Sequence, residues 1–491
     1  MSASREKNKR KDLGTETAPE AKKGMSKGLK TTLMIVCAVV VAALIAFFAL
    51  LNGGFFANHS TAAVVSGHKL TPVQYHYYFY DTLAQNSQYL SMFGITDVSA
   101  LKDEVIDEET GKTFKDYFDE SAMLSAAQTL AVYDEAVANG YTLSEAAQAD
   151  LDSMDQLFDL YALYNGLTSG DAYLQSQYGP YASVKTYKEY CRVMTLANEY
   201  SQKIAADFSY SDSKLADEYA ADPGKYDTVN YRFFNVLDSM FDETDADKLK
   251  QLRLETGEKM AQDSYQNEQA FIDAPLSIVA EDSKATYEDP DATLRANYGR
   301  DAVPASAQEW LFDPARQEGD TICIDNDTFV SVLYFLSYDN LDYPLPNLRI
   351  IPFTVDDITD ELAMAQAKTS AEELLKQYEA GEKNAEAFMA LDTANAFVAE
   401  NVQPDADSKA LADWAFEKLE GGVWARLEGD TAVVEGASGY YVVYYDGLGE
   451  NYRNVKVDTA LRNADYSEWY AATVADADYT LKGFGMFIAD K

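Results

Sequence analysis

Histidine and cysteine, which commonly carry acid–base and nucleophilic catalysis, are scarce in this chain of 491 residues. Its three histidines all precede residue 77: His59, His68 and His76. A Ser-His-Asp or Cys-His nucleophile would need one of these histidines to reach a distant part of the chain. We therefore expect no hydrolase of the triad type.

Motifs that hold metals, nucleotides or redox centres are also missing from the sequence. It has no HExxH, P-loop or CxxC spacing, and the acidic run 242–247 lacks the glycine that an EF-hand loop requires. We interpret that run as the acidic first turn of a helix. Cys191 and Cys323 have no motif around them, which favours two ordinary small buried residues. The sequence therefore predicts no metal, no cofactor and no disulfide-built scaffold.

The composition indicates a folded and strongly acidic protein. An apolar content of 47% is enough to build hydrophobic cores, which excludes wholesale disorder. The chain has 81 acidic and 40 basic residues, a net charge of −41, so most of its surface would repel phosphates. This balance argues against a nucleic-acid partner, and the length predicts about three domains.

The positive charge is concentrated at the N-terminus, directly before an apolar run. Residues 1–30 hold nine basic and four acidic residues, and Leu33–Leu51 is an uninterrupted run of 19 apolar residues. As a helix this run would be about 28 Å long, close to the hydrocarbon core of a bilayer. We predict a cytoplasmic tail over 1–30, a transmembrane signal anchor over 31–52 and an exported remainder, because basic flanks stay inside.

A cleaved signal peptide is the alternative to an anchor. Signal peptides have a shorter apolar core and a cleavage site of small residues. Here the leader is 30 residues long, and the run ends in Asn52-Gly53-Gly54-Phe55-Phe56, which is a poor cleavage context. The pattern therefore favours an uncleaved anchor.

Residues 64–224 show mainly helical periodicity. A short strand or hairpin over 64–70 precedes Thr71, which can cap a helix with Pro72 in its first turn and Gln74 completing a capping box. Five aromatic residues follow within positions 75–80, and further helices are predicted near 114–139, 142–163 and 184–206. A last amphipathic helix over 453–475 precedes a short strand-like tail, and we expect 453–491 to complete this helical domain.

Residues 226–340 and 345–449, called module 1 and module 2, repeat one order of elements. Each module has a strand, a helix, a segment around a tryptophan and a closing hairpin. Three matched landmarks are offset by 117, 104 and 111 residues, and this agreement favours a duplicated unit of about 110 residues.

Several strings, together with this order of elements, resemble the SurA/PrsA-type extracytoplasmic foldases. The strings are Val64–Thr71, Leu215–Tyr219, Lys225–Arg232, Glu309–Asp320 and Gly439–Val443. The resemblance implies an α+β multidomain protein. In it, a membrane anchor helix is followed by an all-helical SurA-like chaperone domain, completed by the C-terminal helix, and two parvulin-like α+β modules.

Parvulins rotate X–Pro bonds, whose barrier is about 18–20 kcal/mol. The resemblance implies a proline pocket with two histidines, one on the first strand and one in the closing hairpin. The matching positions are Tyr231, Arg232 and Val330 in module 1 and Leu348, Arg349 and Tyr441 in module 2. With no histidine at any of them we expect weak or no isomerase catalysis. Desolvation and shape complementarity still leave a weaker activity open.

The resemblance thus implies a single-pass membrane protein whose exported part binds unfolded or nascent secreted polypeptides. The 35 tyrosines suit such work, because tyrosine joins apolar area to a polar tip. The alternative is a non-enzymatic cell-surface binding or scaffolding protein that keeps the foldase architecture.

Overall fold

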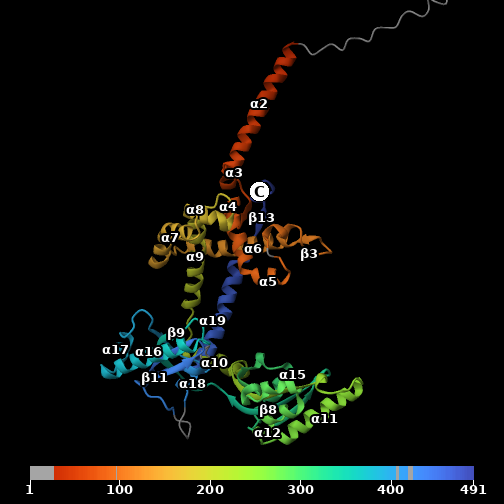
Figure 1. The fold of residues 1–491 in the computed structure, drawn as a ribbon, viewed down its shortest axis with the longest axis vertical. Helices are drawn as coiled ribbons and strands as arrows, with labels where there is room; N and C mark the ends of the chain where they lie inside the picture. Colours follow the sequence, from red (N-terminus) through yellow and green to blue (C-terminus); the bar gives the residue numbers. More distant parts are fainter. Residues whose placement is uncertain (1–26, 96, 405–408, 418–423, 491) are drawn as a thin grey trace, which may run out of the picture. The chain divides into compact units, whose positions relative to one another are not determined.

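The computed structural model describes residues 27–95, 97–404, 409–417 and 424–490 as a mixed α+β protein (Figure 1). The chain divides into two compact units, which we call unit 1 (Met1–Asp207 with Tyr466–Lys491) and unit 2 (Phe208–Asp465). The described residues form four small sheets, two in each unit. This is the α+β class that the sequence predicts.

The N-terminal helix α2 (Lys27–Asn52) is long and apolar enough to cross a membrane. Its window of 19 residues, Met34–Asn52, coincides with the predicted anchor, and its side chains from Met34 to Leu50 are exposed. Exposure on all sides is what an apolar helix shows when lipid, and not protein, is its expected surroundings.

Unit 1 is mainly helical, and the C-terminal segment of the chain completes it. Its further elements up to Asp207 are α3 (Phe55–His59), β1 (Ala63–Val65), β2 (His68–Leu70), α4 (Pro72–Gln85), α5 (Ser87–Met92), η1 (Val98–Lys102), β3 (Val105–Asp107), β4 (Lys112–Thr113), α6 (Phe114–Ala138), α7 (Glu145–Tyr164), α8 (Gly170–Tyr178) and α9 (Val184–Asp207). The C-terminal part adds the end of α19 (Tyr452–Thr473), β13 (Tyr479–Leu481) and α20 (Gly483–Ala489).

The predicted capping box at the start of α4 is confirmed. The Thr71 hydroxyl accepts a hydrogen bond from the Gln74 amide at 3.3 Å, and Gln74 Oε1 accepts one from the Thr71 amide at 3.0 Å. The aromatic run that follows forms much of the core of unit 1, because Tyr75, Tyr77 and Phe79 are buried.

The C-terminal tail differs from the strand-like segment that the sequence suggested. Only Tyr479–Leu481 forms a strand, which pairs with β1 in the three-stranded sheet β13-β1-β2. The chain then turns into the seven-residue helix α20, since its buried Gly485 and Ile488 pack on unit 1 once the strand has ended.

Unit 2 holds two four-stranded antiparallel sheets with one topology, as the matched landmarks predict. Their orders are β6-β5-β8-β7 and β10-β9-β12-β11. The strands of module 1 are β5 (Thr228–Leu237), β6 (Leu294–Gly299), β7 (Thr321–Asp325) and β8 (Phe329–Asp339). Those of module 2 are β9 (Pro344–Thr354), β10 (Phe397–Ala399), β11 (Thr431–Gly436) and β12 (Gly439–Asn451).

Short helices cover both faces of each sheet. In module 1 they are η3 (Asp238–Met240), α11 (Ala246–Ser264), α12 (Glu268–Asp273), α13 (Pro275–Ile278), η4 (Glu281–Ser283), α14 (Lys284–Tyr287), η5 (Pro290–Thr293), η6 (Arg300–Ala302) and α15 (Ala305–Leu311). In module 2 they are α16 (Glu361–Ala380), α17 (Ala385–Met389) and α18 (Lys409–Ala415). One core forms under α11 and α12 and a second under α15, and module 2 repeats this with α16 and α17 on one face and α18 on the other.

The helix α10 (Asp212–Ala221) and the turn η2 (Pro223–Lys225) belong to unit 2, although we had expected residues up to 224 in the helical domain. Leu215 on α10 packs with Tyr226 and with Val457 on α19 in a small buried cluster. This cluster holds α10 and the first part of α19 together within unit 2, so residues 453–465 also lie outside the helical unit that we expected them to complete.

Candidate functional site

The positions that match the parvulin histidines in module 1 are structural. Arg232 is buried on β5, where its Nε donates to Glu268 Oε1 at 2.7 Å. Its Nη1 donates to the Pro290 carbonyl at 2.6 Å and to Thr293 Oγ1 at 3.1 Å. Through these bonds the Arg232 guanidinium holds η5 against the sheet.

The other two positions of module 1 are buried in its core. Tyr231 lies under α15, and its burial raises its pKa to about 12. Val330 on β8 is paired with Val236, whereas Arg232 is paired with Tyr334. Val330 is therefore about 13 Å along the sheet from the partner of Arg232. The structure does not bring these positions together.

Module 2 separates its matching positions in the same way. Leu348 is fully buried, and Arg349 Nη2 lies 2.9 Å from Asp446 Oδ2. The Tyr441 hydroxyl lies 2.6 Å from Ser438 Oγ. Arg349 is paired with Tyr444 on β12, so Tyr441 is about 10 Å along the strand from that pair.

The histidines themselves bind backbone or surface groups of unit 1. His59 donates to the Phe55 carbonyl at 2.8 Å, and His68 contacts Asp134 at 2.9 Å on the surface. His76 Nε2 donates to the Ala489 carbonyl at 3.0 Å, and burial lowers the pKa of His76 below its ordinary value of 6.5. At neutral pH His76 is therefore a neutral hydrogen-bond donor that ties α20 to α4.

Cys191 and Cys323 lack the lowered pKa of a reactive thiol. Burial raises the pKa of both Cys191 and Cys323 to about 11, so neither thiol is a ready nucleophile at neutral pH. Within the described ranges no group of three or more His, Cys, Asp or Glu could hold a metal ion. The acidic run 242–247 leads into a helix but is not its first turn: α11 begins at Ala246, Asp245 caps it by accepting from the Lys248 amide, and only Asp247 lies in the first turn.

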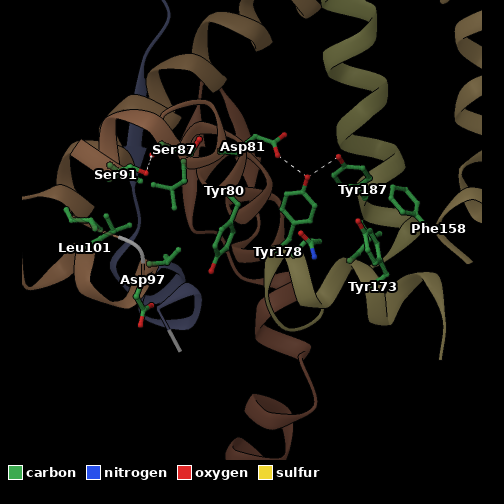
Figure 2. A pocket seen from close by; sticks show the side chains of 17 residues that line it. Tyr80, Asp81, Ser87, Ser91, Asp97, Leu101, Phe158, Tyr173, Tyr178 and Tyr187 are labelled. Carbon is green, nitrogen blue, oxygen red and sulfur yellow. Dashed lines mark hydrogen bonds between the residues drawn. The ribbon is translucent and has the colours of Figure 1, made fainter. Parts of the chain in front are cut away.

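The most site-like feature of unit 1 is a hollow of about 640 Å³, which we call the tyrosine hollow (Figure 2). Its aromatic lining comes from α4, α7, α8 and α9: Tyr80, Phe158, Tyr173, Tyr178 and Tyr187. Its aliphatic and polar lining comes mainly from α4, α5, η1 and α8: Asp81, Leu83, Ala84, Ser87, Leu90, Ser91, Ile95, Asp97, Val98, Leu101, Leu174 and Gln177. None of these 17 described residues is basic.

The two walls differ in character, as Figure 2 shows. One wall, from α5 and η1, carries Ser87, Ser91, Asp97 and Leu101. The other wall is aromatic, and its rings are in mutual contact. The ring centroids of Tyr178 and Tyr187 are 5.1 Å apart, and those of Phe158 and Tyr187 are 5.5 Å apart. Such edge-to-face and tilted contacts hold the rings in place.

Asp81 organises the aromatic wall. It accepts hydrogen bonds from the Tyr178 hydroxyl at 2.9 Å and from the Tyr190 hydroxyl at 2.7 Å, one on each carboxylate oxygen. The Tyr187 hydroxyl lies 3.1 Å from that of Tyr178. Since Tyr178 donates its only hydroxyl proton to Asp81, Tyr187 is the donor in this last bond.

The hydroxyls of the hollow are suited to binding and not to proton transfer. Burial raises the pKa of Tyr187 to about 12, and burial raises the pKa values of Tyr178 and Tyr190 well above the ordinary range of tyrosine. All three stay protonated at any physiological pH. The hollow thus offers fixed rings, neutral hydroxyls and two carboxylates from Asp81 and Asp97.

The sequence predicted the aromatic helix α4, interpreted as a helix packed between others, and did not predict the hollow beside it. The aromatic run at 75–80 was evident, but its partners lie about 80 to 110 residues further along the chain. A signal was present, since residues 161–190 contain seven tyrosines. Only the packing of α7, α8 and α9 reveals which of these tyrosines share one wall.

No protein-family model matches this chain, and no curated protein matches it either.

Proposed function

We propose that this protein is a membrane-anchored, extracytoplasmic chaperone that holds unfolded segments of exported proteins in the tyrosine hollow. The observation that carries the proposal is the hollow itself, with a wall of contacting rings beside a wall of mixed aliphatic and polar side chains. Its volume lies within the range of about 300–1,000 Å³ that is usual for binding sites, so it accommodates a few side chains of a client.

The chemistry of the hollow suits a client without a fixed sequence. Tyrosine rings accept aliphatic and aromatic side chains at low entropic cost, and the hydroxyl oxygens of Tyr178 and Tyr187, whose protons are already donated within the wall, can still accept from an extended backbone. Asp81 and Asp97 bring negative charge, and the whole chain carries −41. We expect preferred segments to pair an apolar or aromatic residue with a nearby lysine or arginine.

The proposed location follows from α2 and the residues before it. A helix of this length and composition can span a bilayer, and the basic residues within 1–30 favour a cytoplasmic N-terminus. The part of the chain after α2 would then lie outside the cytoplasm, where secreted chains fold.

We propose that prolyl isomerisation is at most a minor activity. In module 1 the position of the first family histidine holds Arg232, which is engaged by Glu268 and by the loop at Pro290. The second position holds a buried valine. The resemblance to the SurA/PrsA foldases therefore supports the architecture of a binder more than that of a catalyst.

Aggregation of a reduced client tests the proposal. The full chain in lipid nanodiscs is expected to suppress light scattering of reduced insulin at near-equimolar ratios. Ser91→Trp, which places a large ring on the wall of the hollow, is expected to raise the concentration needed by about tenfold, or about 1.4 kcal/mol of binding energy, because the ring fills space that the client would occupy.

Met92→Trp is the matched control, because Met92 is 79% exposed on the same helix and does not line the hollow. It should suppress aggregation like the parent chain. Failure of the parent chain to suppress aggregation at all would favour the scaffolding alternative.

A further inference from the structure

Exposed aromatic residues gather where α2 ends, on the short helices α3 and α20. Phe55, Phe484 and Phe487 are 46%, 48% and 54% exposed. The helices α20 and α3 pack against each other, so residues more than 400 positions apart form one surface. From Gly483 to Ala489 the chain carries no charged residue.

Two ring contacts link this surface to the apolar helix. The centroid of Phe47, which lies within the Met34–Asn52 window, is 5.5 Å from that of Phe56 on α3. The centroid of Phe56 is in turn 5.4 Å from that of Phe484 on α20. Phe47 is five residues before the end of the window, about 8 Å along the helix axis. The rings of α3 and α20 therefore lie level with the last turns of the apolar helix.

Specific contacts fix α20 in this place. β13 pairs with β1, and the Lys482 amide donates to the Ala62 carbonyl at 2.7 Å just before α20 begins. A Cβ added at Gly485 would lie 2.0 Å from the Thr61 carbonyl oxygen, so only glycine permits this approach. At the other end of α20, the Ala489 carbonyl accepts from His76.

The end of α2 is also tied to unit 1. The Tyr181 hydroxyl donates to the Asn52 carbonyl at 2.8 Å, and Leu51 is buried in the core of unit 1. The apolar helix and the aromatic surface are thus parts of one packed structure.

We propose that α3 and α20 form a second membrane contact, which seats Phe55, Phe484 and Phe487 in the interfacial layer of the bilayer around the exit of α2. The partner is a lipid surface, because the rings continue outward from a helix of membrane-spanning length and aromatic side chains concentrate at that interface. This inference rests on the proposed membrane anchor. If both contacts form, unit 1 is attached to the bilayer at two points, and its orientation relative to the membrane is restricted more than by one helix alone.

Depth-dependent quenching tests the contact in the full chain. Single-cysteine variants carry an NBD label at native Cys37 within the apolar helix, at Phe484→Cys, or at Gln202→Cys, with the remaining cysteines changed to serine. Gln202 is exposed on α9 and serves as the control outside the interface. Each variant is placed in phosphatidylcholine–phosphatidylglycerol liposomes with and without nitroxide-labelled lipid.

We expect the nitroxide to reduce fluorescence by about half or more at both 484 and Cys37, while the label at 202 stays unquenched. Quenching at Cys37 without quenching at 484 would overturn the second contact and leave the anchor standing. Absence of quenching at Cys37 would overturn the anchor, and with it both proposals about the membrane.

A matched pair of glycine variants tests whether packing places α20 there. Gly485→Ala in the 484-labelled chain should remove most of the quenching, because the added Cβ meets the Thr61 carbonyl. Gly483→Ala should leave quenching unchanged, since nothing lies within 4 Å of the added Cβ. Equal quenching in both variants would contradict the placement of α20 by this contact.

Discussion

Replacing Asp81 with leucine should lower the unfolding free energy of unit 1 by about 3 kcal/mol and abolish client binding in the tyrosine hollow. The substitution removes the carboxylate that accepts from the hydroxyls of both Tyr190 and Tyr178. Two partly buried hydroxyls would then lose this acceptor, and the aromatic wall would lose the group that aligns it. Hydrogen exchange of peptides from α4, α8 and α9 measures this loss of stability locally. We expect the protection of their amides to fall about 100-fold.

Asp97→Asn is the charge-matched control. It removes the same charge from the same hollow, but the side-chain carbonyl of the new amide would still accept from the Ser99 amide, as Asp97 does at 2.8 Å. We expect unchanged protection and near-parent suppression of aggregation. Equal losses in both variants would show that negative charge, and not the ordered wall, is what clients need.

Replacing Arg232 with alanine should destabilise module 1 by about 3 kcal/mol without changing prolyl isomerisation. The change leaves the Pro290 carbonyl and Thr293 Oγ1 without their donor and Glu268 without its cation. Hydrogen exchange of β5 and β8 measures the first effect. A proline-limited refolding assay with the full chain measures the second.

The equivalent arginine of module 2 provides the comparison. Arg349 pairs with Asp446, and its side chain is 24% exposed against 7% for Arg232, so Arg349→Ala should cost less than Arg232→Ala, about 1–2 kcal/mol. Arg232→His, which restores the residue type of the family, should destabilise module 1 and leave the slow refolding phase unchanged. A faster slow phase with Arg232→His would show that an isomerase site is still in place.

Local signals in the sequence predicted much of the fold. The Thr71 capping box and the acidic turn before α11 depend on residues within a few positions of one another, so the pattern defines the structure. The repeated order of strands in unit 2 was also readable, because hydrophobic alternation and the tryptophan landmarks recur at similar offsets.

The parts that could not be predicted depend on distant packing. Whether Tyr187 faces Tyr178 or solvent is decided by how α8 and α9 meet, and no local spacing encodes that contact. The helix α20 could not be predicted either, because its apolar sequence is also compatible with a strand. The close approach of Gly485 to the Thr61 carbonyl, which fixes α20 on unit 1, is a contact between distant parts of the chain. The roles of Arg232 and Val330 likewise depend on strand register, which places them several residue pairs apart.

Site-specific photocrosslinking tests the central claim most directly. A benzophenone amino acid replaces Gln177, which lines the tyrosine hollow, or Gln202, which lies on α9 about 22 Å along the helix from Tyr187. The full chain in nanodiscs is irradiated with a permanently unfolded, carboxymethylated client or with the same protein in its folded form. We predict crosslinks at 177 to the unfolded client alone and none at 202. Equal crosslinking at both positions, or none at 177, would contradict a polypeptide-binding role for the hollow.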